Sequence, residues 1–137
     1  AVDHLSMIDD PFFGSFPLVE YHVVLARALL GIGNVDASLA ASFEYAAVAP
    51  DADSVGLLPE RLQMLAAIAA FYGGEDVIAR AASRAYLDAG GIDAAEPLVV
   101  AIRIRLLRDT EARMAASLER EARSQRPEVD WDALLDE

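Results

Sequence analysis

One apolar segment near the N-terminus carries the residues best suited to line a binding pocket. Glu20 and Arg27 are seven residues apart, so a helix would place both on one face. A carboxylate and a guanidinium buried together either form a structural ion pair, which is the default, or line a pocket. His22 would point to a different face, and a histidine on an apolar helix is usually a hydrogen-bonded core residue. Together with the hydroxyl of Tyr72, they form our set of candidate pocket residues: Glu20, His22, Arg27 and Tyr72.

The chain lacks the residue types that most recognisable side-chain chemistry requires. Its 137 residues include two histidines, no cysteine and no lysine, so all eleven basic residues are arginines. This composition excludes a thiol nucleophile, a Cys-ligated metal, a Schiff base and a P-loop lysine. A Ser/His/acid triad would need His4 or His22 as its base, and no serine lies in a strand–turn–helix elbow. We therefore predict no catalytic, cofactor-binding or metal-binding residue and favour a non-enzymatic role.

A basic segment lies between an acidic body and an acidic C-terminal end. The net charge is −12, yet residues 101–126 carry seven arginines against four acids, and the last eleven residues carry five acids. The overall charge argues against phosphate-neutralising contacts with nucleic acid. The basic segment is either a solvated helix with alternating charges or a helix that docks on an acidic surface, its own or a partner's. We name four of its arginines as candidate partner-binding residues: Arg103, Arg105, Arg108 and Arg113.

Residues 125–137 are predicted to form an acidic tail with a hydrophobic motif. Trp131, Leu134 and Leu135 are set among acids, which is typical of a docking motif that folds on contact with a partner. The alternative is that Trp131 packs back onto its own domain. Both interpretations stay open, and the three residues join the candidate partner-binding set.

The pattern of apolar residues predicts an all-α fold of about five helices. Ser15 and Pro17 are typical of a helix start, Asn34 can cap a second helix, and Pro59 can open a third. The first helix is apolar nearly all round, which predicts a place at the centre of the core. The second half of the last helix is expected to project from the body or to support an oligomer contact. The predicted helices cover residues 16–32, 35–48, 59–72, 75–89 and 94–124.

We divide the chain into an N-terminal arm at residues 1–15, a single all-helical domain at residues 16–124 and the tail at residues 125–137. Phe12, Phe13 and Phe16 predict that the arm packs on the body. No apolar stretch of 18 or more residues is uninterrupted, so no transmembrane helix is predicted. With no visible targeting segment, the expected location is cytoplasmic. The expected partner is a protein or a second copy of the chain, without nucleic acid and without a membrane.

A faint internal repeat relates two helix–turn–helix units. Placing residues 21–60 over residues 61–100 gives eight identities in forty positions. Three of the identical pairs fall at the packing turn and at the glycine between the helices: Leu25 with Leu65, Ala26 with Ala66, and Gly33 with Gly73.

The first of these units carries residues that would lock a helical hairpin: His22, Leu25, Ala26, Leu39, Phe43, Ala46 and Pro50. With these residues the unit resembles a tetratricopeptide-type helical hairpin. The second unit departs from that pattern, because it has no aromatic residue at the corresponding position of its second helix and has Gly90 where the family closes with proline. The resemblance implies two antiparallel hairpins and a concave surface that binds a protein or peptide.

Residues 57–107 are also similar in rhythm to the carboxymuconolactone decarboxylase and alkylhydroperoxidase D-like family. The peroxidase branch of that family carries Cys-x-x-Cys and then His on the turn and the following helix. This chain has Gly74, Val77 and Ala81 near those places. The resemblance therefore implies an oligomeric helical fold without its redox chemistry.

Our leading hypothesis is a non-enzymatic helical-repeat domain that mediates protein–protein interaction in a scaffold or a regulator. The alternative is an oligomeric domain of the alkylhydroperoxidase D-like type, without redox activity, that binds a small ligand between its first and third helices. A third alternative is a structural subunit of a larger assembly, with the fifth helix as its contact.

Overall fold

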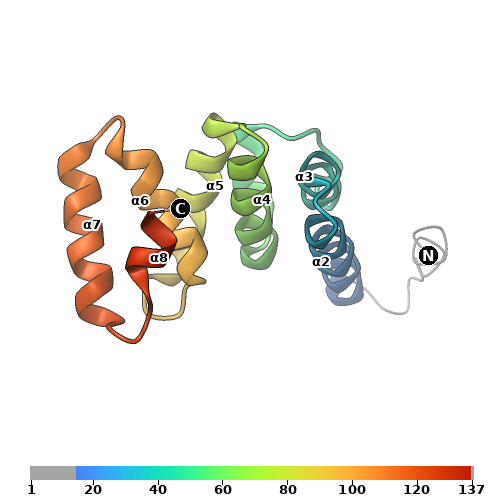
Figure 1. Cartoon of the computed structure of the whole chain (residues 1–137). Coiled ribbons are helices and arrows are strands. Elements are labelled where there is room, and N and C mark those ends of the chain that lie inside the picture. Colours follow the sequence, from blue (N-terminus) through green and yellow to red (C-terminus); the bar gives the residue numbers. More distant parts are fainter. Residues whose placement is uncertain (1–14, 137) are drawn as a thin grey trace.

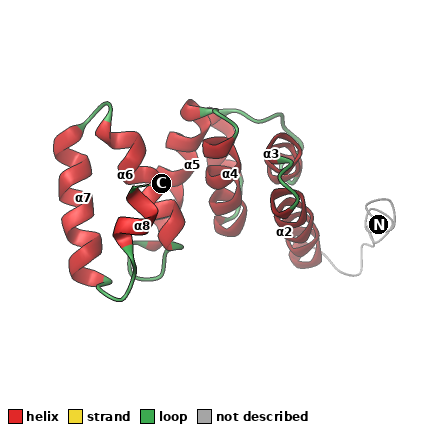
Figure 2. Ribbon diagram, in the orientation of Figure 1, coloured by secondary structure: helices red, strands yellow, loops and turns green. Residues whose placement is uncertain are grey.

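The computed structural model describes residues 15–136, and within this range the chain consists of helices and their connections, with no strand (Figures 1 and 2). The all-α prediction is therefore confirmed for the described residues. The arm predicted at residues 1–15 lies outside them, except for Ser15, with which the first described helix begins. In chain order the elements are α2 (Ser15–Gly31), α3 (Val35–Glu44), the 3-10 helix η1 (Ala52–Leu57), α4 (Glu60–Tyr72), α5 (Asp76–Gly90), α6 (Pro97–Arg108), α7 (Ala112–Gln125) and α8 (Trp131–Leu135).

The prediction of about five helices is wrong, mainly because the segment 94–124 forms two helices rather than one. The chain leaves the helical path after Arg108, where aspartate and threonine follow and both are poor helix formers. The N–H of Glu111 donates to the carbonyl of Leu107 at 2.7 Å and closes the turn. The next helix, α7, then packs back on α6 and buries Ala115 and Ala122. This half of the segment therefore does not project from the body.

The turn between α2 and α3 has the same geometry as the turn between α4 and α5. Gly33 follows α2 with a φ of 84°, and Gly74 follows α4 with a φ of 78°, a backbone conformation that costs glycine little. In each turn the glycine N–H donates to the carbonyl three residues earlier, and the next N–H donates to the carbonyl five residues earlier. Asn34 then caps α3 by accepting a hydrogen bond from the N–H of Ala37 at 3.2 Å, as predicted. The equivalent glycines are 41 residues apart, so the pairing of Gly33 with Gly73 is one residue out of register.

The helices form a row of consecutive pairs (Figure 1). Within the pairs, α2 packs on α3, α4 on α5, and α6 on α7. Between the pairs, α3 packs on α4 and α5 on α6, while the first helices also meet, α2 with α4 and α4 with α6. The second helices α3, α5 and α7 contact one another at most marginally. Each pair therefore packs on its neighbours in the chain.

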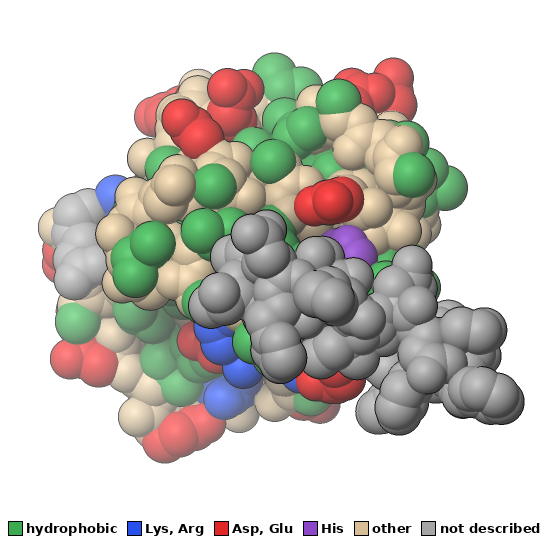
Figure 3. Space-filling model, turned by 90° about the vertical axis from the view of Figure 1, so that its right-hand side faces the viewer, with side chains coloured by type: hydrophobic (Ala, Val, Ile, Leu, Met, Phe, Trp, Pro, Cys, Tyr) green, Lys and Arg blue, Asp and Glu red, His purple; other side chains and the backbone are tan. Residues whose placement is uncertain are grey.

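The centre of the core is α4 rather than α2. Residues 65–70 of α4 are buried without interruption because α2, α3, α5 and α6 surround this helix. By contrast, α2 lies at the end of the row, where Val24 is 52% exposed. The face at this end carries hydrophobic side chains next to acidic ones (Figure 3). The prediction that the first helix lies at the centre of the core is therefore wrong, because an apolar composition does not fix how many helices pack around it.

The C-terminal residues pack on the domain through α8, which contacts α6. Trp131 is 2% exposed, and its Nε1 donates a hydrogen bond to the carbonyl of Arg126 at 2.9 Å. Leu135 is buried beside it, and Asp132 accepts a hydrogen bond from Arg123 at 2.6 Å. Of the two interpretations of the tail, the structure has the one in which Trp131 packs on its own domain. None of the described helices is both long and apolar enough to span a membrane.

Candidate functional site

The four candidate pocket residues do not come together in the fold. Glu20 forms an ion pair with Arg61 of α4 instead of Arg27, and Arg27 is exposed on α2. Tyr72 is also exposed, at the end of α4, and only His22 is buried. None of the four lines the groove that runs between α5 and α7. We therefore do not place the site at α2.

His22 is a packed core residue. Its Nδ1 lies 3.1 Å from the carbonyl oxygen of Leu18, one turn earlier on α2. Its ring meets those of Tyr21 and Tyr45 edge to face, with centroids 4.9 and 5.9 Å away. Burial lowers the pKa of His22, and the negative charge of Glu44 partly opposes that effect. These contacts favour a neutral imidazole with a structural role.

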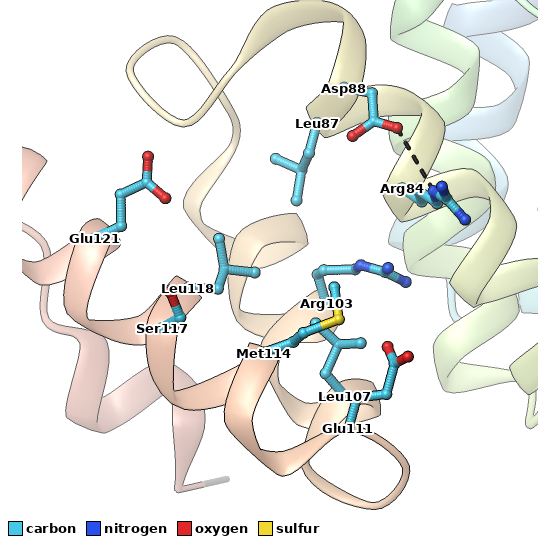
Figure 4. A pocket seen from close by; sticks show the side chains of 10 residues that line it. All are labelled: Arg84, Leu87, Asp88, Arg103, Leu107, Glu111, Met114, Ser117, Leu118 and Glu121. Carbon is cyan, nitrogen blue, oxygen red and sulfur yellow. Dashed lines mark ion pairs between the residues drawn. The ribbon is translucent and has the colours of Figure 1, made fainter.

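A groove runs between α5 and α7, with α6 beneath it (Figure 4). Its two overlapping parts have volumes of about 530 and 550 Å³. Leu107 of α6 lines both parts, and Met114 of α7 is 51% exposed in one of them. Val77 of α5 is 70% exposed in the other part. The groove exists because α5 and α7 both pack on α6 and hardly on each other, which leaves large apolar side chains uncovered.

Three arginines and one carboxylate, that of Glu111, line the part of the groove nearer the beginnings of α5 and α7. Arg80 donates to the hydroxyl of Thr110 at 2.9 Å, and Arg103 donates to the backbone carbonyl of Arg80 at 3.4 Å. Neither guanidinium forms an ion pair with a carboxylate of the described residues. Arg84, one turn further along α5, reaches Asp88 at 3.6 Å in a solvent-exposed pair. Two of the three cations are thus held by neutral oxygens and keep their capacity to bind an anion.

The pKa of Arg103 is lowered mainly by burial, and charges of both signs surround its guanidinium. Burial lowers the pKa of its guanidinium, and the neighbouring charges of Arg84 and Arg80 lower it further. Asp88 and Glu111 oppose these effects only in part. An arginine stays protonated at neutral pH even so, and a bound carboxylate would offset the repulsion among the three cations.

The other end of the groove is acidic. Asp88 lies near the end of α5, and Glu121 lies in the second half of α7. Arg84, Arg103, Leu107 and Glu111 line both parts of the groove, whereas Arg80 lines the basic part alone. The groove therefore has an apolar floor, a basic end and an acidic end.

Of the arginines in this groove, Arg103 was among the residues predicted from the sequence, whereas Arg80 and Arg84 of α5 were not. Arg80 and Arg84 are one turn apart on the helix predicted at residues 75–89, which was the available signal. A continuous helix at residues 94–124 gives no reason to expect Arg80 and Arg84 near Met114. The turn before α7 is what places α7, and Met114 with it, opposite α5.

The other candidate partner-binding residues have different surroundings. Arg105 lies over the ring of Phe71, 5.0 Å from its centroid, and Arg113 is exposed on α7 outside the groove lining. Arg108 pairs with Glu119 at 3.0 Å and donates to the carbonyl of Leu135 at 3.4 Å. Within the tail, Trp131 and Leu135 are buried, and Leu134 is half-buried.

Glu119 joins α6, α7 and α8 electrostatically. It accepts hydrogen bonds from Arg108 at 3.0 Å and from Arg123 at 3.1 Å. The hydrogen bond from Arg108 is the main reason that the pKa of Glu119 is lowered; burial opposes it, and the bond from Arg123 adds to it. Because Arg123 also binds Asp132, the basic segment docks partly on acidic groups of its own chain.

Comparison with protein-family models, with curated proteins and with solved structures finds no significant match for this chain. Within residues 15–136, no cluster of three or more histidine, aspartate or glutamate side chains could hold a metal ion.

Proposed function

We propose that this chain is a non-enzymatic helical-repeat domain that binds a segment of a protein partner in the groove between α5 and α7. The groove itself carries the proposal, because it leaves Met114 and Val77 uncovered beside a cluster of arginines. An apolar surface with a polar rim is the usual character of a protein-binding site. A scaffold or a regulator would use such a domain.

The order of packing supports the repeat. Each helix pair packs on its neighbours in the row, and pairs that are not neighbours meet at most marginally. The first helix of the last pair, α6, packs against α8, in the way that a cap covers a terminal repeat. The fourth residue of each second helix is small and buried, which lets the preceding helix approach closely. These residues are Ser38 in α3, Ala79 in α5 and Ala115 in α7.

The alternative fold of the alkylhydroperoxidase D-like type gains no comparable support. It would place a ligand between α2 and α4, near Glu20 and Arg27. Glu20 instead pairs with Arg61 across those two helices, and Arg27 is exposed. We therefore argue for the groove between α5 and α7 alone.

The test is a selection of displayed random peptides on the full chain, followed by affinity measurement of the selected peptides. We expect the selection to give peptides whose affinity falls about tenfold or more when Met114→Glu is introduced, because an apolar ligand would bury the new carboxylate. Ala116→Glu is the matched control, since it adds the same residue to the exposed side of α7, outside the groove. Peptides that bind both variants as well as the unmodified chain would contradict the proposal.

A further inference from the structure

The walls of the groove limit how a peptide can be recognised there. The described residues contain no strand, so an extended peptide finds no sheet edge with which to pair. The described residues that line the groove include no aromatic side chain, which a polyproline ligand would need. What the groove offers is an apolar floor of aliphatic and methionine side chains between two helices. This is the surface on which an amphipathic helix lays its apolar face.

The groove has the length of a short helix. Its lining extends along α5 from Val77 to Asp88, and on the other side from Glu111, which precedes α7, to Glu121 within α7. At about 1.5 Å per residue, ten residues of a wall correspond to about 15 Å, or about three turns of a bound helix. The apolar residues inside this length are Val77, Ala81, Leu87, Leu107, Met114 and Leu118.

The charges at the two ends distinguish the two directions in which a helix could lie. A helix carries partial positive charge at its N-terminus and partial negative charge at its C-terminus. Arg80, Arg84 and Arg103 line one end of the groove together with one carboxylate, Glu111, so this end carries net positive charge. Asp88, which pairs with Arg84, and Glu121 lie toward the other end. A ligand helix gains at both ends only when its C-terminal turn lies on the arginines.

From this polarity, and resting on the proposed function, we infer that the groove binds an amphipathic α-helix of a partner protein in one direction. The C-terminal turn of that helix carries carboxylates that pair with Arg84 and with Arg80 or Arg103. Its N-terminal turn lies beside Asp88 and Glu121, and its apolar face covers Met114. The bound helix therefore runs antiparallel to α5 and α7, because the arginines lie where those two helices begin.

The test uses two fluorescein-labelled peptides of 14 residues with one composition and the same side-chain staple. Both carry leucines at helical spacing, and they differ in whether two glutamates occupy the last turn or the first. The staple, checked by circular dichroism, equalises their helicity, which terminal glutamates would otherwise change. Fluorescence anisotropy on the full chain at low salt should show about fivefold tighter binding of the peptide with C-terminal glutamates.

Arg84→Gln removes one cation and should abolish most of this preference. Arg113→Gln is the matched control, because Arg113 is an exposed arginine of α7 outside the groove lining and should leave the preference intact. Equal affinity of the two peptides, or tighter binding of the one with N-terminal glutamates, would overturn the inferred direction. If neither peptide binds, the inference of a helical ligand is wrong. The proposed function fails only if the random selection also gives no peptide whose binding is weakened by Met114→Glu.

Discussion

Replacing Trp131 by alanine should destabilise the domain by about 3 kcal/mol, at the lower end of the range for a buried aromatic residue. The indole is 2% exposed and fixes α8 on α6, with Nε1 bonded to the carbonyl of Arg126. The loss is limited because α8 is terminal and can detach without unfolding the rest of the domain. For a chain of this length, about 3 kcal/mol corresponds to a fall in Tm of about 10 °C.

The assay is urea unfolding followed by circular dichroism, with tryptophan fluorescence as a second probe of the unmodified chain. Trp131 is the single tryptophan, so its emission reports on the docking of α8 alone. Trp131→Phe is the matched control and should cost less, because it keeps most of the apolar contact and loses the hydrogen bond, worth about 1 kcal/mol. If Trp131→Ala costs less than about 1 kcal/mol, α8 is not docked and the reasoning about the tail is wrong.

Three further predictions concern the fold. The pKa of His22 is lower in the folded chain than in the unfolded chain, so the neutral imidazole contributes stability above the unfolded pKa, and this contribution is lost as the pH falls through the folded pKa. Urea unfolding should therefore show that His22→Gln loses less stability than the unmodified chain between pH 7.5 and pH 5. Glu119→Gln should cost about 1 kcal/mol at pH 7, and that difference should vanish as acid protonates the lowered-pKa carboxylate of the unmodified chain. Gly74→Ala should cost about 1 kcal/mol because alanine is strained at a positive φ, whereas Gly56→Ala, also in open space but without a positive φ, should be close to neutral in thermal melts.

Local signals in the sequence predicted much of the helical framework. Asn34 and the glycines of the two turns act through bonds to near neighbours in the chain, so their roles follow from residue type alone. The break before α7 was missed, because the apolar stripe of Met114, Leu118 and Ala122 also fits a longer, continuous helix. Packing against α6 decides between the two, and that is a tertiary effect.

The candidate site was predicted only in part, for a similar reason. The spacing of Glu20 and Arg27 correctly indicates one helix, but which neighbour each side chain meets depends on the position of α4. Arg103 was identified from the charge of its segment, whereas its proximity to Arg80 depends on contacts between residues far apart in the chain. The tail remained open in the sequence because a tryptophan among acids suits docking on a partner and docking on its own domain equally well.

The most direct test of the binding groove is a ¹H–¹⁵N correlation titration of the full chain with the stapled peptide that has C-terminal glutamates. The account predicts saturable shift changes at the groove-lining residues of α5, α6 and α7, including Arg84, Leu107 and Met114. Residues of α2 and α3, at the far end of the row, should not respond. Saturable changes centred on α2 and α3, or no saturable change anywhere, would contradict it.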